Sequence, residues 1–221
     1  DGTVDNMVAD YVFSFTTVAL PSVSAAINEI RIDQSSSDND EYFELKGDAD
    51  GSLDGFTYLV IGDGSGGSGV IEAVVDLTGS VIGSDGLFVA AEDTFTLATA
   101  DLTTTLNFEN GDNVTHFLVK NFTGSDGDDL DTDDDGVLNV TPWSEIADSV
   151  SLIQTTDVPA SGEYYYSATV VGPDGTYVPG HSYYCPSEWM IGDFSLGMDD
   201  TPGAENDCPT PAIIINEVDA D

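Results

Sequence analysis

The densest group of potential ligand side chains lies between residues 126 and 136, in the sequence DGDDLDTDDDG. Asp131, Asp133, Asp135 and Gly136 match the first half of a D-x-D-x-D-G calcium loop, in which alternate side chains converge on one cation and the glycine allows the turn. All of the donors are oxygens, which suit calcium. The sequence therefore predicts a calcium site here, with a solvated acidic loop as the alternative.

The second half of the loop departs from the calcium pattern. Position twelve, where a bidentate glutamate normally stands, is Pro142. We expect the remaining ligands to come from Asp129, Asn139, Glu145 and the backbone carbonyl of Val137, or from another loop, and otherwise the site is weak.

A weaker candidate for cation binding lies in the turn between two expected strands. Asp48, Asp50 and Asp54 are spaced so that they could surround a cation. Asp-Gly pairs are also ordinary turn residues, so the same pattern fits a turn without any metal.

The charge of the chain limits its partners. The sequence has 42 acidic residues against three basic ones, for a formal net charge of −39. Such a charge repels nucleic acid and anionic lipid and attracts cations. No apolar run is long enough to cross a bilayer, so we predict no membrane insertion. Self-repulsion of this size is relieved by salt or divalent ions, so a saline, calcium-containing surrounding is expected.

Two cysteines and three sequons bear on the compartment. A disulfide between Cys185 and Cys208 is expected over the alternative of two buried thiols, and it implies an oxidising, extracytoplasmic location. Asn113, Asn121 and Asn139 each begin an N-x-T sequon and are candidate glycosylation sites, although such triplets arise easily in a threonine-rich chain.

Short β-branched and aromatic segments separated by Gly, Asp and Ser clusters predict an all-β fold, an immunoglobulin-like β-sandwich. Three of these segments are EYFELKG, GFTYLVIGDG and EYYYSATVV. His116 is expected to be a packed or surface residue of a strand, and His181 a structural residue in a loop among tyrosines. No nucleophile motif surrounds a serine, so catalysis by this segment is not expected.

The end of the chain repeats its first expected core strand. Residues 27–33, INEIRID, align with residues 215–221, INEVDAD, and prolines precede both strings. Residues 213–221 are therefore interpreted as the start of a second copy, with a chance resemblance between two alternating strands as the alternative. An unpaired strand of this kind is also able to join a neighbouring copy by strand addition through residues 213–219.

From Ile27 to Asn206 the chain resembles the lamin tail domain family, in the form found in secreted bacterial multidomain proteins. The motifs that carry this resemblance are INEI (27–30), EYFEL (41–45), LDGFTYLV (53–60), NGDNVTHFLV (110–119), the GDDLDTDDDG…TPW block (127–143), DSVSL (148–152) and TPGAEN (201–206). The segment before them resembles the last strands of a bacterial Ig-like domain. The resemblance implies an Ig-like sandwich without catalytic machinery, which occurs in tandem or beside nuclease, phosphatase or adhesion modules.

These features divide the chain into three parts. Residues 1–20 are expected to be the end of an Ig-like module or an extension, 21–207 the lamin tail-like sandwich, and 208–221 a linker with the first strand of a following copy. The leading hypothesis is a calcium-stabilised, non-catalytic structural or adhesive module of a secreted bacterial protein, extracellular or at the cell surface, in a tandem array or a self-assembling surface filament. The alternatives are an accessory domain of a secreted nuclease or phosphatase and a glycan-binding module.

Overall fold

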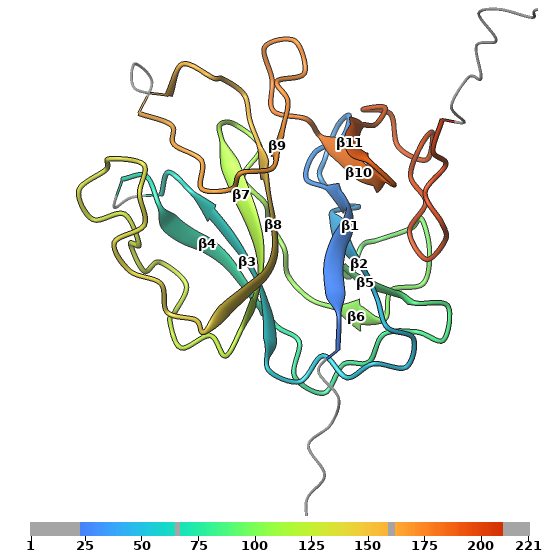
Figure 1. Ribbon diagram of the computed structural model, residues 1–221. Helices are drawn as coiled ribbons and strands as arrows, with labels where there is room; N and C mark the ends of the chain where they lie inside the picture. Colours follow the sequence, from blue (N-terminus) through green and yellow to red (C-terminus); the bar gives the residue numbers. More distant parts are fainter. Residues whose placement is uncertain (1–22, 65–66, 159–161, 210–221) are drawn as a thin grey trace, which may run out of the picture.

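The computed structural model describes residues 23–64, 67–158 and 162–209, which form a sandwich of two β-sheets (Figure 1). The predicted all-β sandwich is confirmed. The N-terminal segment 1–20, expected to be the end of an Ig-like module or an extension, and the repeated segment 213–221 lie outside the described residues.

One sheet has six strands in the order β11-β10-β1-β2-β5-β6. All of its neighbours are antiparallel except β5 and β6, which are parallel. Its strands are β1 (Ala25–Arg31), β2 (Tyr42–Gly47), β5 (Leu87–Ala91), β6 (Leu102–Thr103), β10 (His181–Cys185) and β11 (Glu188–Ile191).

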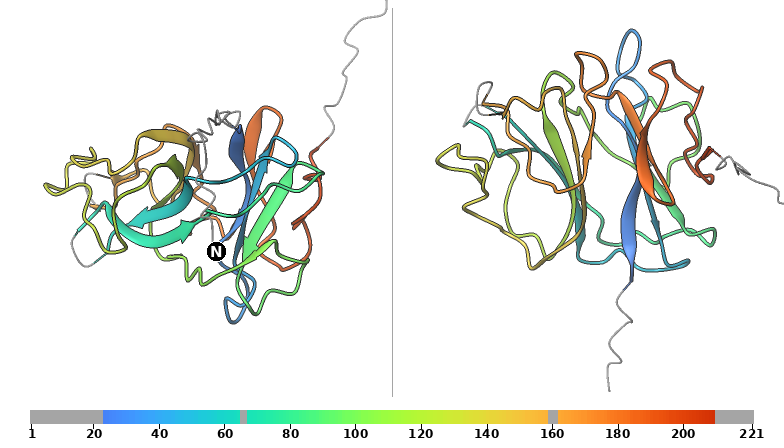
Figure 2. Two further views of the ribbon diagram at one scale, coloured as in Figure 1. Left: turned by 90° about the horizontal axis from the view of Figure 1, so that it is seen from below. Right: turned by 45° about the horizontal axis from the view of Figure 1, so that its top comes forward.

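The other sheet has five strands in the order β4-β3-β7-β8-β9, and only β8 and β9 are parallel. Its strands are β3 (Phe56–Gly62), β4 (Val70–Asp76), β7 (Val114–Lys120), β8 (Glu145–Leu152) and β9 (Val170–Val171). Figure 2 shows the two sheets from below as two separate layers.

The main core lies between the sheets, and loops cover their outer faces. Phe43 of β2 stacks on Tyr58 of β3 with the ring centroids 3.7 Å apart, which joins the two layers. The outer face of the five-stranded sheet forms a second apolar cluster, which includes Leu59 and Phe117 and is covered by Leu130 and Trp143. Strands covered on both faces lose their alternation, which explains why every residue of β3 is buried.

A bulge in β1 decides which of its side chains face outward. The pairing with β2 shifts between Ile27 and Glu29, so Asn28 is the extra residue. Beyond it, Ile30 packs in the core, while Glu29 and Arg31 lie on the opposite face of the strand, where they are fully buried by other parts of the chain. The first INE string, residues 27–29, therefore contains a β-bulge followed by a buried carboxylate.

Most of the expected strands are present, with one group of exceptions. Of the segment EYYYSATVV, only Val170–Val171 is a strand. The segment expected to be a loop around His181 is instead β10, which pairs with β1 and β11. No helix in the described part of the chain is long and apolar enough to span a membrane.

Candidate metal site

The acidic loop, residues 126–136, runs along the outer edge of β4 and is hydrogen-bonded to it. Ile71 donates its backbone N–H to Asp128 O at 3.0 Å, and Gly127 donates to Ile71 O at 2.8 Å. Leu130, 1% exposed, anchors the loop in the apolar cluster on the outer face of the sheet. The loop thereby covers an edge strand that would otherwise offer unpaired backbone groups to other chains.

Three of the predicted ligands converge in this loop. Carboxylate oxygens of Asp131, Asp133 and Asp135 lie within 4.8 Å of one another. Asp131 is fully buried, whereas the other two are exposed. Gly136 adopts a φ of +84°, the conformation that the glycine of the pattern was expected to supply.

The buried carboxylate of Asp131 organises the loop around itself. Its Oδ1 accepts a hydrogen bond from the backbone N–H of Asp135 at 3.2 Å, and its Oδ2 accepts one from Gly136 at 2.8 Å. The Tyr166 hydroxyl donates to the same Oδ2 at 2.8 Å. Burial, together with the charge of Asp131, raises the pKa of Tyr166. The loop is therefore folded with its carboxylates on one side, a donor set that suits a hard cation such as calcium.

The other predicted ligands are engaged elsewhere. Asp129 Oδ1 accepts the backbone N–H of Asp131 at 3.1 Å, and Asn139 Oδ1 accepts the Thr132 hydroxyl at 3.0 Å. Glu145 begins β8 and pairs with Lys120 at 3.1 Å. The structure thus brings together the three aspartates of the first half of the loop, and these three other residues do not belong to that group.

Further carboxylates crowd the β3–β4 hairpin beside the acidic loop. Burial, reinforced by neighbouring carboxylates, raises the pKa of Glu72 to about 7 and that of Asp112 to about 8. Glu72 Oε2 and Asp112 Oδ1 are buried without a hydrogen-bond partner among the described residues. Asp126, at the start of the loop, is among the charges acting on Glu72. At this end of the sandwich the protein therefore disfavours the ionised form of these two carboxyl groups.

The weaker candidate for cation binding, the turn with Asp48, Asp50 and Asp54, has the hydrogen bonds and backbone conformation of an ordinary turn. Asp48 Oδ2 accepts the backbone N–H of Ser24 at 2.8 Å, and Asp54 Oδ1 accepts that of Gly79 at 2.8 Å. Asp50 has a φ of +58°. Within the described ranges, the three carboxylates do not form a cluster that could hold one ion.

The three sequons differ in what they offer to a glycosylating enzyme. Asn113 is 1% exposed, and its Nδ2 donates to Thr155 O at 3.0 Å and to Glu163 O at 2.7 Å. The nitrogen that would carry a glycan is therefore buried in the folded chain. Asn121 and Asn139 are exposed.

His116 is the packed strand residue that the sequence predicted. It is fully buried on β7, where Nδ1 lies 2.8 Å from the Tyr58 hydroxyl. Burial lowers its pKa to about 3. The imidazole is thus a neutral member of the core.

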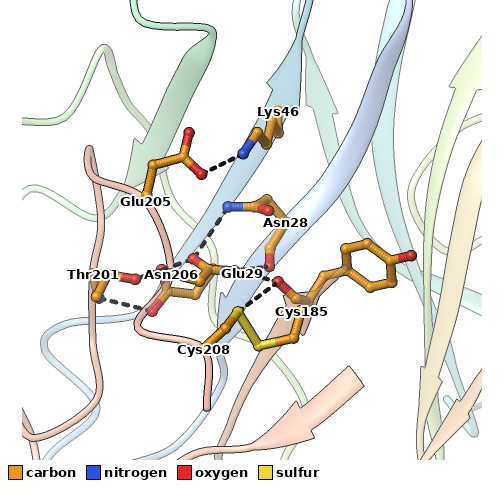
Figure 3. Close-up of a disulfide and its surroundings, with 9 residues drawn as sticks. Asn28, Glu29, Lys46, Cys185, Thr201, Glu205, Asn206 and Cys208 are labelled. Atoms are coloured by element: carbon orange, nitrogen blue, oxygen red, sulfur yellow. Dashed lines mark hydrogen bonds and ion pairs between the residues drawn. A yellow bond between two sulfur atoms is a disulfide. The ribbon is translucent and has the colours of Figure 1, made fainter. Parts of the chain in front are cut away.

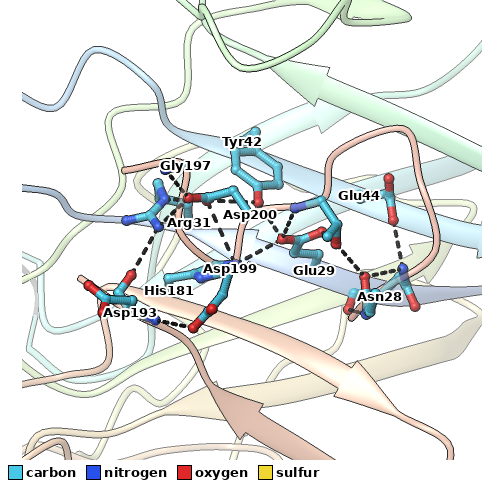
Figure 4. A network of polar contacts seen from close by, with 12 residues as sticks. Asn28, Glu29, Arg31, Tyr42, Glu44, His181, Asp193, Gly197, Asp199 and Asp200 are labelled. Carbon is cyan, nitrogen blue, oxygen red and sulfur yellow. Dashed lines mark hydrogen bonds and ion pairs between the residues drawn. The ribbon is translucent and has the colours of Figure 1, made fainter. Parts of the chain in front are cut away.

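The most extensive polar group in the described chain was not predicted from the sequence (Figure 4). Arg31 Nε and Nη2 donate to the two oxygens of Asp200 at 2.6 and 2.7 Å. Glu29 Oε1 accepts the Tyr42 hydroxyl at 2.6 Å and lies 2.8 Å from His181 Nε2. Burial alone would raise the pKa of Asp200, but the hydrogen bonds from Arg31 and the charge of His181 lower it.

Glu29, His181 and Asp200 offer three ligand atoms within 4.8 Å, but Arg31 already supplies the positive charge in this space. The arrangement is better suited to holding strands together than to holding a metal. One sequence signal did exist: Arg31 is one of only three Lys and Arg residues and stands between two isoleucines, Ile30 and Ile32.

The network ties the segment 193–208, hereafter the strap, to the outer face of β1 and β2. Thr201 donates from its backbone and its hydroxyl to the two oxygens of Glu29, both at 2.9 Å. Glu44 accepts hydrogen bonds from Asn28 Nδ2 and from the Gly203 N–H, each at 2.6 Å. Burial nevertheless raises the pKa of Glu44 to about 7.

A disulfide closes the strap (Figure 3). Cys185, the last residue of β10, is bonded to Cys208, as the sequence predicted. Beside it, Asn206 Nδ2 donates to Asn28 O at 3.2 Å and to Tyr184 O at 2.8 Å. The end of the described chain is therefore held both covalently and by hydrogen bonds next to the bulge of β1.

Comparison with known proteins gives no relative: no family model, no curated protein and no solved structure matches this chain.

Proposed function

We propose that this chain is a non-catalytic structural module of an extracellular bacterial protein, stabilised by calcium and repeated end to end along its parent chain. The order of motifs that resembles lamin tail domains supports this reading. The disulfide is consistent with an oxidising compartment.

The strap is the observation that carries the proposal. β1 begins at the lower end of the sandwich, and the last described residues lie at its upper right (Figure 1). The exit of the chain is locked to β1 and β10 by the disulfide and by Asn206. The described chain thus begins at one end of the sandwich and ends at another, where the disulfide and Asn206 fix its last residues. This arrangement is suited to linear connection with further modules.

The second INE string fits the start of a following module better than a replacement for β1 in a neighbouring copy. In the alignment of 27–33 with 215–221, Asp219 takes the place of Arg31. A strand carrying aspartate there would bury a carboxylate against Asp200 and remove the guanidinium that donates to both of its oxygens. Burying two unpaired like charges is strongly unfavourable. We therefore favour the tandem array over a strand-swapped filament.

Calcium is proposed for the loop of Asp131, Asp133 and Asp135. The support is the fit of the donor set, together with the buried carboxyl oxygens of Glu72 and Asp112 nearby, which have no hydrogen-bond partner among the described residues. A cation at this position would fix the loop that covers the edge of β4, and so would protect the sheet from pairing with other chains.

The sequence that follows Asp221 in the parent protein tests the tandem arrangement. We expect a second sandwich that ends in a strap like TPGAEN, with a basic residue at the counterpart of Asp200, because Asp219 would need an opposite charge. A metal-hydrolase domain in that place would contradict the tandem proposal and would make this chain an accessory domain of a secreted nuclease or phosphatase.

A further inference from the structure

The two sheets separate on the side where β10 and β11 face β8 and β9, and they leave a cleft of about 480 Å³. One wall carries Tyr184 and Trp189, which are cross-strand partners with ring centroids 5.9 Å apart. The opposite wall carries Asp148 and Thr169. The volume lies within the range of about 300–1,000 Å³ that is common for small-ligand sites.

The charged groups of this cleft, Asp148 and Glu188, are hydrogen-bond acceptors. Asp148 Oδ2 receives the backbone N–H of Ile27 at 2.8 Å, which fixes the carboxylate at the junction of the sheets. Glu188 and Ser187, both exposed, lie at the mouth. No basic residue lines the cleft. The cleft is therefore suited to a ligand that brings O–H donors.

We propose that this cleft binds a neutral sugar unit of a polysaccharide. A pyranose ring presents an apolar C–H face, which packs on an aromatic side chain, and hydroxyl groups at its edge, which donate to carboxylates. Asp148 and Glu188, in a chain of net charge −39, disfavour uronic and sialic acids. This inference goes beyond the proposed structural role and does not require the module to be repeated.

The assignment to a sugar takes account of the aromatic wall as well as the charge. A ligand recognised by charge alone would bind equally well at many acidic places on this surface. Tyr184 is 42% exposed beside the partly buried Trp189. Such a pair, opposite a fixed carboxylate, selects for a flat apolar face with hydroxyls at its rim.

The test uses the two tryptophans of the chain. Trp143 packs on Phe117 in the outer apolar cluster, so a Trp143→Phe variant of the full chain leaves Trp189 as the only indole. This variant is titrated with neutral cello-, malto- and xylo-oligosaccharides, with oligogalacturonate and with chitosan oligomers, while the fluorescence of Trp189 is followed. We expect a saturable change with at least one neutral oligosaccharide and none with oligogalacturonate.

Substitutions in the same titration locate the site. Glu188→Gln changes an exposed side chain, and we expect it to weaken binding several-fold. Retention of the full chain on the matching insoluble polysaccharide should fall about tenfold in Trp189→Ala, an effect typical of losing an aromatic anchor. Tyr177→Ala, which removes a 71% exposed tyrosine outside the cleft, serves as the control and should bind as the parent does.

Three outcomes would overturn the inference. The first is the absence of a saturable response to every neutral oligosaccharide. The second is a stronger response to chitosan oligomers than to any neutral sugar, which would make the cleft a site for organic cations. The third is an equal loss of binding in Tyr177→Ala and Trp189→Ala.

Discussion

Arg31 and Asp200 stand 169 residues apart in the sequence, yet they form a doubly hydrogen-bonded ion pair with 0% and 1% of their side chains exposed. The pair joins β1, one of the first elements of the sandwich, to the strap that ends it. Since an ion in the interior cannot be solvated by water, each partner depends on the other. The ion pair therefore forms only when the strap lies against β1.

Removing the buried cation should open the strap. Arg31→Met leaves Asp200 buried without the guanidinium that pairs with it, so we expect a loss of roughly 3–5 kcal/mol in the free energy of unfolding. Lys46→Met is the matched control, because Lys46 and Glu205 form an exposed pair, 48% and 72% exposed, worth about 0–1 kcal/mol. Urea unfolding of both variants measures the difference. Equal losses would contradict the assigned role of the pair.

The ion pair of Arg31 and Asp200 also leads to a prediction about strand exchange between copies. Asp219→Arg gives the second INE strand the cation that Arg31 supplies in β1, so this variant should form dimers or larger species that the parent chain does not form. Asp221→Arg makes the same change of charge at the position aligned with Asp33, outside the ion pair. Light scattering at several protein concentrations compares the two variants. Association of both to the same extent would show that charge alone, and not the ion pair, controls assembly.

The sequence was sufficient for the sandwich, because strands such as β3 are recognisable from their β-branched and aromatic residues. It also gave the disulfide and the convergence of Asp131, Asp133 and Asp135, since both follow from local spacing or from the presence of only two cysteines.

The polar network of the strap could not be predicted from the sequence. Its members lie up to 178 residues apart, and no local pattern links Asn28 to Asn206. The bulge at Asn28, which turns Glu29 outward, is likewise a matter of pairing between strands. The assignment of His181 to a loop was wrong for a related reason: β10 is a strand because β1 and β11 flank it.

Stability should fall as the pH rises from about 4.5 to about 8 when no divalent ion is present. Burial raises the pKa of Glu41 from 4.5 to about 8, although Phe108 donates its backbone N–H to both carboxylate oxygens. Because the folded-state pKa is above the unfolded value, the folded chain holds this proton more tightly. The stabilisation is complete below pH 4.5 and is lost as the pH rises through about 8.

Glu41→Gln tests this dependence. The amide keeps an acceptor for the Phe108 N–H and has no charge to bury, so the variant should melt a few degrees above the parent at pH 8 in chelator. The gap should close at low pH, where the parent carboxyl is protonated. Glu188→Gln, which changes an exposed carboxylate, should leave the melting curve unchanged both at pH 8 and at low pH. A difference in melting temperature between Glu41→Gln and the parent that does not vary with pH would contradict the proposed cost of burying the ionised Glu41 carboxylate.

The central claim is that a divalent cation on the acidic loop completes this fold, and thermal unfolding with calcium or with chelator, at matched ionic strength, tests it most directly. A cation bound only to the folded chain stabilises it by about 2.7 kcal/mol at 100 times the dissociation constant, and each kcal/mol shifts the melting temperature by roughly 2–4 °C. We expect a shift of this size in the parent and in the control Asp174→Asn, and almost none in Asp133→Asn/Asp135→Asn. Identical melting temperatures in calcium and in chelator for the folded parent chain would contradict the claim.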